Sequence, residues 1–362
     1  MLSGFDSIRL RKVHTLFLIS LSVVIAFASI SSVQASENAQ AARLLAVAGD
    51  GFRIHRTDHF FVVSDSDDDS VQALSYRLES TYQAVERFCE AMKLPIRPPP
   101  GRLPVIHFNR YSQFQRYSRA IGFEDASAPG FYHLQNNTIA FCNLPDFPPL
   151  QEISRRIEQA EAQRDPSVAP EQIGEWRSQR DALVETFNRL VIQHEAAHQI
   201  LFNVGVLSRD ADNPDWLVEG LACQFEVSAP QALNQMRLAD FREALGVAVN
   251  AVDIDETTLR YAFTTGRFLS LADLFTDRMF NAPDEHTRKF RYAQAWGLVY
   301  YLHSDHGNAL AAYLRRITAP ASPGGIYEFE AVFGPTELPT LHGPGWIDAL
   351  LRLPFEPISP SR

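Results

Sequence analysis

The first third of the chain alternates between short apolar runs and longer segments with helical spacing. Residues 60–63 and 105–108 are rich in β-branched and aromatic side chains, which predicts two strands. Residues 70–92 carry apolar side chains at intervals of three and four positions, which predicts a helix, and a second helix is predicted over residues 111–121. Two apolar runs separated by a polar turn predict a hairpin over residues 130–142.

The remainder of the chain has a predominantly helical pattern. Residues 151–180 are highly charged with a break near Pro166, which predicts a solvated helical hairpin. For residues 36–55 we expect a short segment, helical or loose, that precedes the first predicted strand. We therefore expect an α+β fold, with a small mixed sheet followed by a mostly helical C-terminal subdomain. The predicted divisions are a signal peptide (1–35), a sheet subdomain (36–150), a charged helical insertion (151–182), a helix pair (183–228), a helical C-terminal subdomain (229–353) and a tail (354–362).

The N-terminus has the parts of a secretory signal peptide: a basic stretch up to Lys12, an apolar run over residues 16–30 and small residues before Ser36. We expect cleavage after Ala35, which predicts a secreted or periplasmic protein. The alternative is an uncleaved membrane anchor, but the apolar run is shorter than the roughly 20 residues of a span and contains three serines. No later segment resembles a span, so we expect no membrane contact after cleavage.

Charge and cysteine content narrow the function classes. The chain has a formal net charge of -10, and its first 35 residues carry three basic residues against one acidic residue, so the mature chain would carry -12. Such an acidic protein is a poor partner for nucleic acid, and we expect none. Cys89, Cys142 and Cys223 are odd in number and widely spaced, so one disulfide is possible and none is required.

The segment HEAAH at residues 194–198 carries the candidate chemistry. It lies within residues 183–202, which lack Gly and Pro and have apolar residues at helical spacing, so a helix is predicted. Residues four apart share a helix face, which lets His194 and His198 reach one cation while Glu195 points beside it at a water. A chance match to this pattern is expected in roughly 2% of such sequences, so a third ligand is needed.

A second predicted helix supplies that ligand, Glu219. Asn213 can cap this helix with Pro214 in its first turn, which is the favoured place for proline. A loop through Gly205 lets the second helix fold back beside the first. The two helices are expected to approach closely because both contain small residues, at Ala196, Ala197, Gly220 and Ala222.

Together the two segments resemble the signature of the gluzincin zinc metallopeptidases. HEAAHQ at residues 194–199 matches the first metal helix, and WLVEGLACQFE at residues 216–226 is similar to the second, which reads Trp-Leu-x-Glu-Gly-x-Ala in this family. The similarity runs over about residues 60–351 and is closest to the peptidase-MA-like domains of unknown function in secreted bacterial proteins. It implies a zincin-like fold, a Zn2+ cofactor and a peptide or protein substrate.

The resemblance also implies which residues bind the metal: His194, His198 and Glu219. Two other side chains compete for the third position, namely Glu226, two turns further along the same helix, and Cys223, one turn further. The family motif selects Glu219. Glu226 is then expected to act as a structural acid that bonds a helix or holds a metal-binding histidine.

The implied mechanism uses an open position on the metal, where a water is activated and the substrate carbonyl is polarised. Glu195 takes a proton during the attack and returns it to the leaving amine. Tyr292 is the candidate oxyanion donor, because gluzincin aminopeptidases have a tyrosine in this role at the start of a similar downstream helix. The lysine and glycine that follow that tyrosine in the family are absent here, and a tyrosine packed at a helix start is the alternative.

Gluzincins also bind extended peptide along an edge strand beside the metal helix. The hairpin over residues 130–142 could offer this edge by strand addition, or it could be an ordinary core hairpin. Three functions are compatible with the sequence: an active extracytoplasmic metallopeptidase, a non-catalytic zinc-stabilised binding or scaffold domain, and a metal-dependent hydrolase of another substrate. Glu195 favours activity, because a scaffold does not need a base beside the metal.

Overall fold

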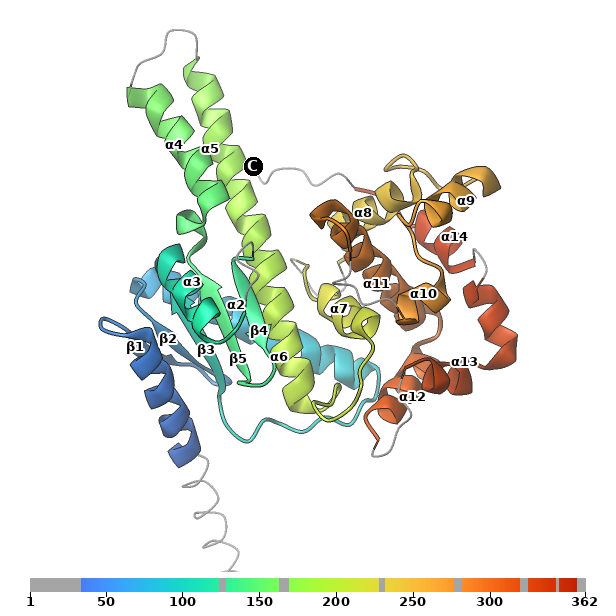
Figure 1. Ribbon diagram of the computed structural model, residues 1–362, viewed down its shortest axis with the longest axis horizontal. Helices are drawn as coiled ribbons and strands as arrows, with labels where there is room; N and C mark the ends of the chain where they lie inside the picture. The colour runs from blue at the N-terminus through green and yellow to red at the C-terminus, as the bar shows by residue number, and fades with distance from the viewer. Residues whose placement is uncertain are drawn as a thin grey trace, which may run out of the picture.

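The computed structural model describes residues 34–123, 128–162, 169–227, 232–276, 282–319, 325–342 and 345–356. A five-stranded sheet with its helices forms one part of the molecule, and helices of the C-terminal half form the other (Figure 1). This arrangement confirms the predicted α+β class. The predicted signal peptide lies outside the described residues as far as residue 33. Among the described helices, none combines the length and the apolar character that a membrane crossing requires.

The sheet has the strand order β1-β2-β3-β5-β4. The central strands β2 (Phe60–Ser64), β3 (Leu103–Phe108) and β5 (Thr138–Cys142) run parallel, whereas β1 (Arg53–Arg56) and β4 (Gly130–His133) lie antiparallel at the two edges. The predicted strands and the hairpin are confirmed. β1 lies in the segment expected to be helical or loose, because its sequence Arg-Ile-His-Arg contains no apolar run.

Helices cover both faces of the sheet: α2 (Asp68–Ala91) and α6 (His194–Val204) on one, and α3 (Tyr111–Ala120) and a helix of residues 34–48 on the other. Neighbouring residues of β2 therefore enter different cores. Val62 joins the core with α2 and α6, and Val63 joins the opposite one. Burial on both faces explains why the central strands are continuous apolar runs rather than alternating ones.

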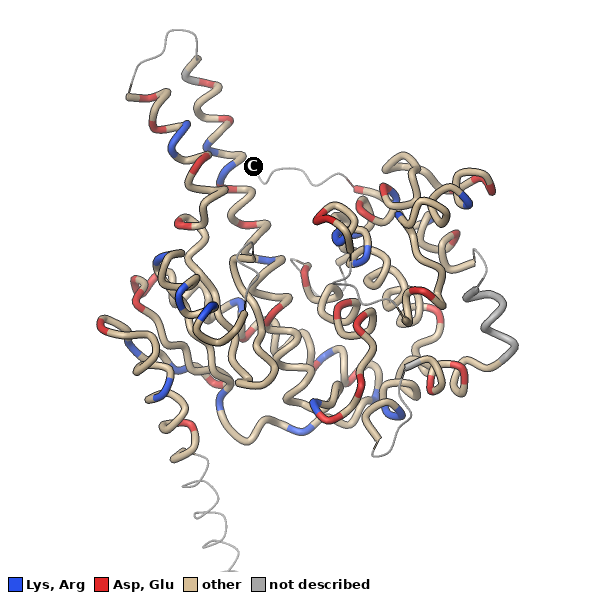
Figure 2. The backbone as a smooth tube through the Cα atoms, in the orientation of Figure 1, with Lys and Arg blue, Asp and Glu red and all other residues tan. Residues whose placement is uncertain are grey.

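The helices α4 (Pro148–Ala162) and α5 (Pro170–Phe187) form a hairpin that stands out from the body of the molecule (Figure 1). Charged residues of both signs occur along both helices (Figure 2). α5 continues with helical backbone through a π-helical segment (Asn188–Gln193) into α6, so the charged hairpin is joined directly to the helix that carries His194. The π-helical turn is a feature that the apolar spacing did not indicate.

The C-terminal half contains α7 (Asp215–Cys223), α8 (Gln235–Leu245), α9 (Glu256–Thr264), α10 (Leu271–Thr276), α11 (Glu285–Asp305), α12 (Gly307–Ile317), α13 (Gly325–His342) and α14 (Gly345–Leu351). α11 is the central helix of this group, since it packs against α7, α8 and α14 and buries most of its side chains between Phe290 and Leu302. Most of the apolar residues in this stretch share one hydrophobic core with α2 and α6. The three cysteines are buried and free, so no disulfide forms among them.

His107 is a buried histidine near the carboxyl end of the central strand β3. Its Nδ1 lies 3.2 Å from the hydroxyl oxygens of both Ser64 and Ser66. Burial lowers the pKa of His107 to about 4, against the opposing attraction of Asp65 and Asp67. The folded protein therefore holds His107 neutral at a pH where an exposed histidine is already protonated.

The free energy of unfolding should consequently fall as the pH falls below about 6.5, where histidine in the unfolded chain begins to take up its proton. The contribution of His107 is fully present above that pH and decreases by about 3 kcal/mol as the pH approaches its folded-state pKa. Urea denaturation at about pH 7.5 and about pH 4.5 measures it. His107→Gln should flatten this dependence, and an unchanged dependence in the variant contradicts the prediction.

Candidate metal centre

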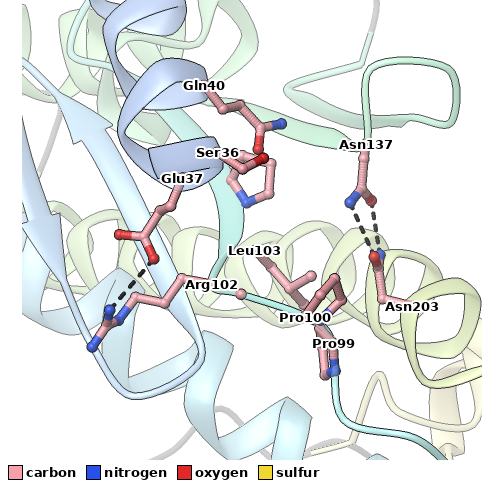
Figure 3. Close-up of a pocket in the computed structure, with 11 residues that line it drawn as sticks. Ser36, Glu37, Gln40, Pro99, Pro100, Arg102, Leu103, Asn137 and Asn203 are labelled. Atoms are coloured by element: carbon pink, nitrogen blue, oxygen red, sulfur yellow. Dashed lines mark hydrogen bonds and ion pairs between the residues drawn. The ribbon is translucent and has the colours of Figure 1, made fainter. Parts of the chain in front are cut away.

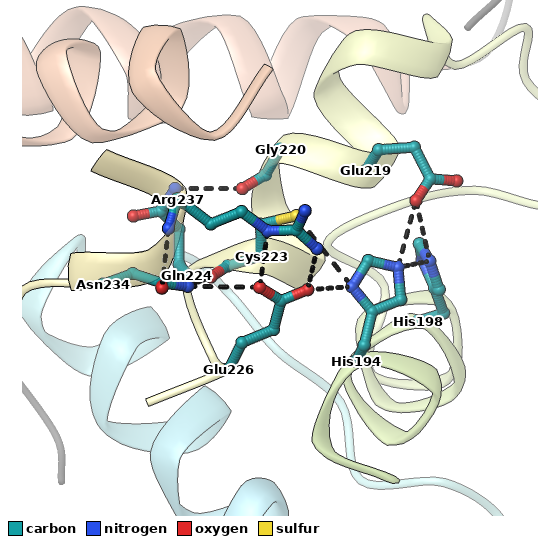
Figure 4. Close-up of polar contacts among 9 residues, drawn as sticks. All are labelled: His194, His198, Glu219, Gly220, Cys223, Gln224, Glu226, Asn234 and Arg237. Atoms are coloured by element: carbon teal, nitrogen blue, oxygen red, sulfur yellow. Dashed lines mark hydrogen bonds and ion pairs between the residues drawn. The ribbon is translucent and has the colours of Figure 1, made fainter. Parts of the chain in front are cut away.

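His194 and His198 lie one turn apart on α6 and point to the same side of it (Figure 4). Their Nε2 atoms are 3.0 Å apart, and each residue is only 6% exposed. Two ring nitrogens at this distance need either a proton on one of them or a cation between them, because two lone pairs repel. The helix thus presents two nitrogen donors to one point.

Glu219 of α7 completes a group of three side chains that can each donate a lone pair to a metal ion, the three donors. Its Oε2 lies 3.0 Å from Nε2 of His194 and 3.4 Å from Nε2 of His198. Tetrahedral zinc, with ligand distances near 2.0–2.1 Å, separates its ligand atoms by about 3.3–3.4 Å. The observed spacing is close to this value, so the three buried side chains could hold one metal ion. Although burial opposes it, attraction to His198 and His194 lowers the pKa of Glu219 and keeps the carboxylate charged.

The loop between the two helices differs in one respect from expectation. Gly205 ends α6 with a φ of 87°, in the left-handed region that favours glycine, as the predicted turn requires. Asn213 does not cap α7, so that prediction is wrong: α7 begins after Pro214, and the Asn213 side chain donates to the carbonyl oxygen of Ser208 (2.6 Å). Asn213 therefore stabilises the loop instead of the helix.

Gly220 brings α7 against α11. A Cβ at Gly220 would lie 2.5 Å from the carbonyl oxygen of Ala295 and 2.7 Å from the Val299 side chain. The expectation that Gly220 serves the contact with α6 is therefore wrong. Successive helix positions point about 100° apart, so the residue after Glu219 turns away from α6.

Glu195 lies beside the three donors and is held by the edge of the sheet. The backbone N–H of Tyr132 in β4 donates to its Oε2 at 2.8 Å. Cys142 of β5 donates to the carbonyl oxygen of Pro129, and alternation in antiparallel pairs then directs the Tyr132 N–H away from β5, to the free edge. Burial, together with repulsion by Glu219, raises the pKa of Glu195 against the attraction of the histidines.

A second polar group lies on the other side of the His194 ring (Figure 4). Oε1 of Glu226 is 2.8 Å from Nδ1 of His194, and Sγ of Cys223 is 3.9 Å from the same nitrogen. Both competitors for the third ligand thus face the nitrogen that points away from Glu219. Asn234 and Arg237 of the α8 N-terminus bind Glu226. Burial acts to raise the pKa of Glu226, but Arg237 and His194 together outweigh it and lower the pKa to about 2.

Tyr292 lies next to His194, with the two ring centroids 5.8 Å apart. It does not open its helix as expected, because Asp284 caps α11 two turns earlier. Burial, and after it the charge of Glu219, raises the pKa of Tyr292, so its hydroxyl is protonated at neutral pH. The structure therefore brings Tyr292 to the site from inside a helix.

A pocket of about 310 Å³ lies near the other end of α6 (Figure 3). It is lined by the helix of residues 34–48, by the end of the Pro-rich loop and the start of β3 (residues 99–104), and by Asn137 and Asn203, whose amides bond each other. Neither the three donors nor Glu195 belong to its lining. We therefore assign the candidate chemistry to the buried group and not to this pocket.

Fold and site together define an α+β protein with a buried group of two histidines and a glutamate that could hold a metal ion. A family model described as a protein of unknown function (DUF1570) matches residues 189–322. The matched segment includes the three donors, Glu195 and Tyr292, but its description carries no activity. No curated protein matches the chain.

Gly220→Ala should destabilise the protein, because the added Cβ has no room against the backbone of Ala295. We expect the free energy of unfolding to fall by about 1–3 kcal/mol, the usual effect of overpacking, as measured by chemical denaturation. Gly174→Ala in α5 is the matched control, since no atom lies within 4 Å of its added Cβ. Helix propensity should leave that variant unchanged or stabilise it by up to about 1 kcal/mol. Equal effects of the two substitutions would refute the close contact.

Proposed function

We propose that this chain is a secreted zinc metallopeptidase of the gluzincin type, which hydrolyses peptide bonds. The observation that carries the proposal is the convergence of Nε2 of His194, Nε2 of His198 and Oε2 of Glu219 beside the carboxylate of Glu195. Two imidazoles and one carboxylate are a ligand set of catalytic zinc sites, in which three protein ligands leave a fourth position open. A zinc ion held there would polarise a substrate carbonyl and lower the pKa of a water to about 7.

Glu195 is the general base in this proposal. Its raised pKa suits a carboxylate that must accept a proton from the water as that water attacks the substrate carbonyl, and must give the proton up afterwards. The Tyr132 N–H holds Oε2 in place, and we assign the transferred proton to Oε1. As the water oxygen bonds to the carbonyl carbon, its proton goes to Oε1, and when the C–N bond breaks this proton passes to the nitrogen of the leaving amine.

Tyr292 is proposed as a second donor to the oxyanion that develops on the substrate carbonyl. Two observations support this assignment. Its ring lies against the ring of His194, and its raised pKa keeps the hydroxyl protonated at neutral pH. A fixed, protonated hydroxyl at the site stabilises negative charge as it forms, without the reorganisation that water would need.

The proposed substrate is an extended segment of a peptide or protein. β4 is the edge strand of the sheet and lies beside α6, and an extended peptide can add to such an edge through the backbone groups other than the Tyr132 N–H, which binds Glu195. The acidic composition of the chain argues against nucleic acid as a partner. We also propose that the protein is secreted or periplasmic, that its signal peptide is cleaved after Ala35, and that the mature chain has no membrane contact.

Glu195→Gln should remove most of the hydrolysis while the zinc is retained. The substitution takes away a proton acceptor but none of the three ligands, so we expect kcat to fall by about 10²–10⁴-fold. The measurement compares purified wild type and variant on a diverse peptide library and determines the zinc content of both.

The same comparison separates the alternatives. Zinc in both forms with no peptide cleaved differently would favour a zinc-stabilised scaffold. Glu195-dependent hydrolysis of ester or non-peptide amide substrates alone would favour another metal-dependent hydrolase. A wild-type protein that binds no zinc would remove the proposal altogether.

Glu219→Ala should weaken zinc binding far more than Glu226→Ala. The first substitution removes a ligand, whereas the second removes the acceptor that holds His194, a change that typically costs about 10–100-fold in metal affinity. Competition with a chelator measures the zinc Kd of both variants. The reverse order of the two losses would make Glu226 the ligand.

Tyr292→Phe should lower kcat by about 10²-fold or more, the usual effect of removing one oxyanion donor, while the zinc content stays unchanged. Steady-state kinetics on a cleaved library peptide provides the measurement. Tyr300→Phe is the control on the same helix, because the Tyr300 ring packs at a tilt against Trp296, whereas the Tyr292 ring packs against His194. If both variants keep the wild-type kcat, Tyr292 is only a packed residue.

A further inference from the structure

We infer that Arg237 of α8 is a positioning residue of the metal centre, which fixes Glu226 as the hydrogen-bond acceptor of His194. The inference rests on the proposed zinc site. It concerns residues outside the motif and outside the set of proposed ligands. The chain of contacts runs from Arg237 through Glu226 to the ring of His194 (Figure 4).

Arg237 holds Glu226 with two parallel hydrogen bonds. Its Nε donates to Oε2 of Glu226 at 2.8 Å, and its Nη2 donates to Oε1 at 2.7 Å. The Glu226 side chain is 0% exposed and that of Arg237 is 12% exposed. A two-pronged pair between a guanidinium and a carboxylate fixes the plane of the carboxylate, and a lysine cannot reproduce this geometry.

Asn234 supports the same arrangement from the N-cap position of α8. Its Nδ2 donates to Oε2 of Glu226 at 3.1 Å and to the carbonyl oxygen of Cys223 at 3.3 Å. Its Oδ1 accepts the backbone N–H of Arg237 at 3.2 Å and so caps the helix. The helix cap and the carboxylate clamp are therefore built from the same residues.

The clamp decides which nitrogen of His194 carries the proton. Both oxygens of Glu226 accept hydrogen bonds from Arg237, so Glu226 faces Nδ1 of His194 as a carboxylate, which can only accept. Nδ1 must then bear the hydrogen, and Nε2, which faces Glu219 and His198, is the nitrogen left to offer a lone pair to a metal ion. This tautomer and ring orientation are the ones that a metal ligand needs.

The clamp also excludes a second metal ion at the cluster of His194, Cys223 and Glu226, which share ligand atoms within metal-binding range. A cation there would have to replace one of the four donors that Glu226 already binds, and it would lie close to the positive guanidinium of Arg237. Like charges at such distance in a buried site repel strongly. The cluster therefore serves the first site and does not form one of its own.

Arg237 contacts Tyr292 as well. The guanidinium carbon lies 5.2 Å from the centroid of the Tyr292 ring, within the range of cation–π attraction. One side chain of α8 thus touches the acid that holds a proposed ligand and the ring of the proposed oxyanion donor. Loss of Arg237 should disturb both, although Arg237 is not itself one of the proposed ligands.

The test is a double-mutant cycle on zinc affinity with the full chain. Zinc Kd values are measured by chelator competition for wild type, Arg237→Met, Glu226→Gln and the double variant. We expect each single substitution to weaken binding by about 10–100-fold, and the double variant to be no weaker than Glu226→Gln, because Arg237 acts through Glu226. The visible absorption bands of the cobalt-substituted protein should shift in Arg237→Met, since they report ligand geometry.

Arg242→Met is the control for a purely structural role. Arg242 is a buried arginine on the same helix that donates to the carbonyl oxygens of Leu351 and Leu353, away from the site. Its loss should reduce stability and leave the zinc Kd within about 2-fold of wild type. If Arg237→Met does not fold, Arg237→Lys takes its place, and we expect it to restore only part of the affinity.

A folded Arg237 variant with wild-type zinc affinity and unchanged cobalt bands would overturn the inference, as would losses that add up in the double variant. In either case the proposed zinc site itself would stand, because the wild type binds the metal. Failure of the wild type to bind zinc would instead overturn the proposed function, so the two failures are distinguishable.

Discussion

The structure depends on holding two imidazoles and a carboxylate within 3.0–3.4 Å of one another in the protein interior. Buried polar groups are costly unless each has a partner, and three donors aimed at one point can satisfy one another only through protons or a shared cation. The surrounding residues restrict all three. α7 is pressed onto α11 at Gly220, which fixes Glu219, while the His194 ring is held between Glu219 and Glu226.

The sheet and the charged hairpin both act on the first turn of α6. The free edge of β4 holds Glu195 through the Tyr132 N–H, so the proposed base is fixed by a strand and the proposed ligands by helices. α5 runs through the π-helical segment directly into α6. Such segments occur often at functional sites, and here one changes the hydrogen-bond register immediately before His194.

The sequence predicted the parts of the site that are local and missed those that depend on packing. His194 and His198 could be placed on one face because helix periodicity alone determines their relation. The facing direction of Gly220 was wrong, since it depends on which helix packs beside α7. Arg237 carried no signal in the sequence, because it lies on another helix and at no metal-ligand spacing from the motif.

In the fold, as in the site, local features could be predicted from the sequence, whereas features that depend on packing could not. The central strands were predictable because burial on both faces makes them continuous apolar runs, whereas the polar edge strand β1 was not. Asn213 is a good cap by residue type, but its amide found partners within the loop. Tyr292 reaches the site from the interior of α11 because Asp284 starts that helix two turns earlier than the sequence indicated.

The most direct test of the account is anomalous diffraction at the zinc absorption edge from crystals of the full chain. The account predicts one strong peak per molecule, at about 2.0–2.2 Å from Nε2 of His194, Nε2 of His198 and an oxygen of Glu219. A peak bound instead by Cys223 and Glu226, or no zinc peak in protein purified without chelator, would contradict it.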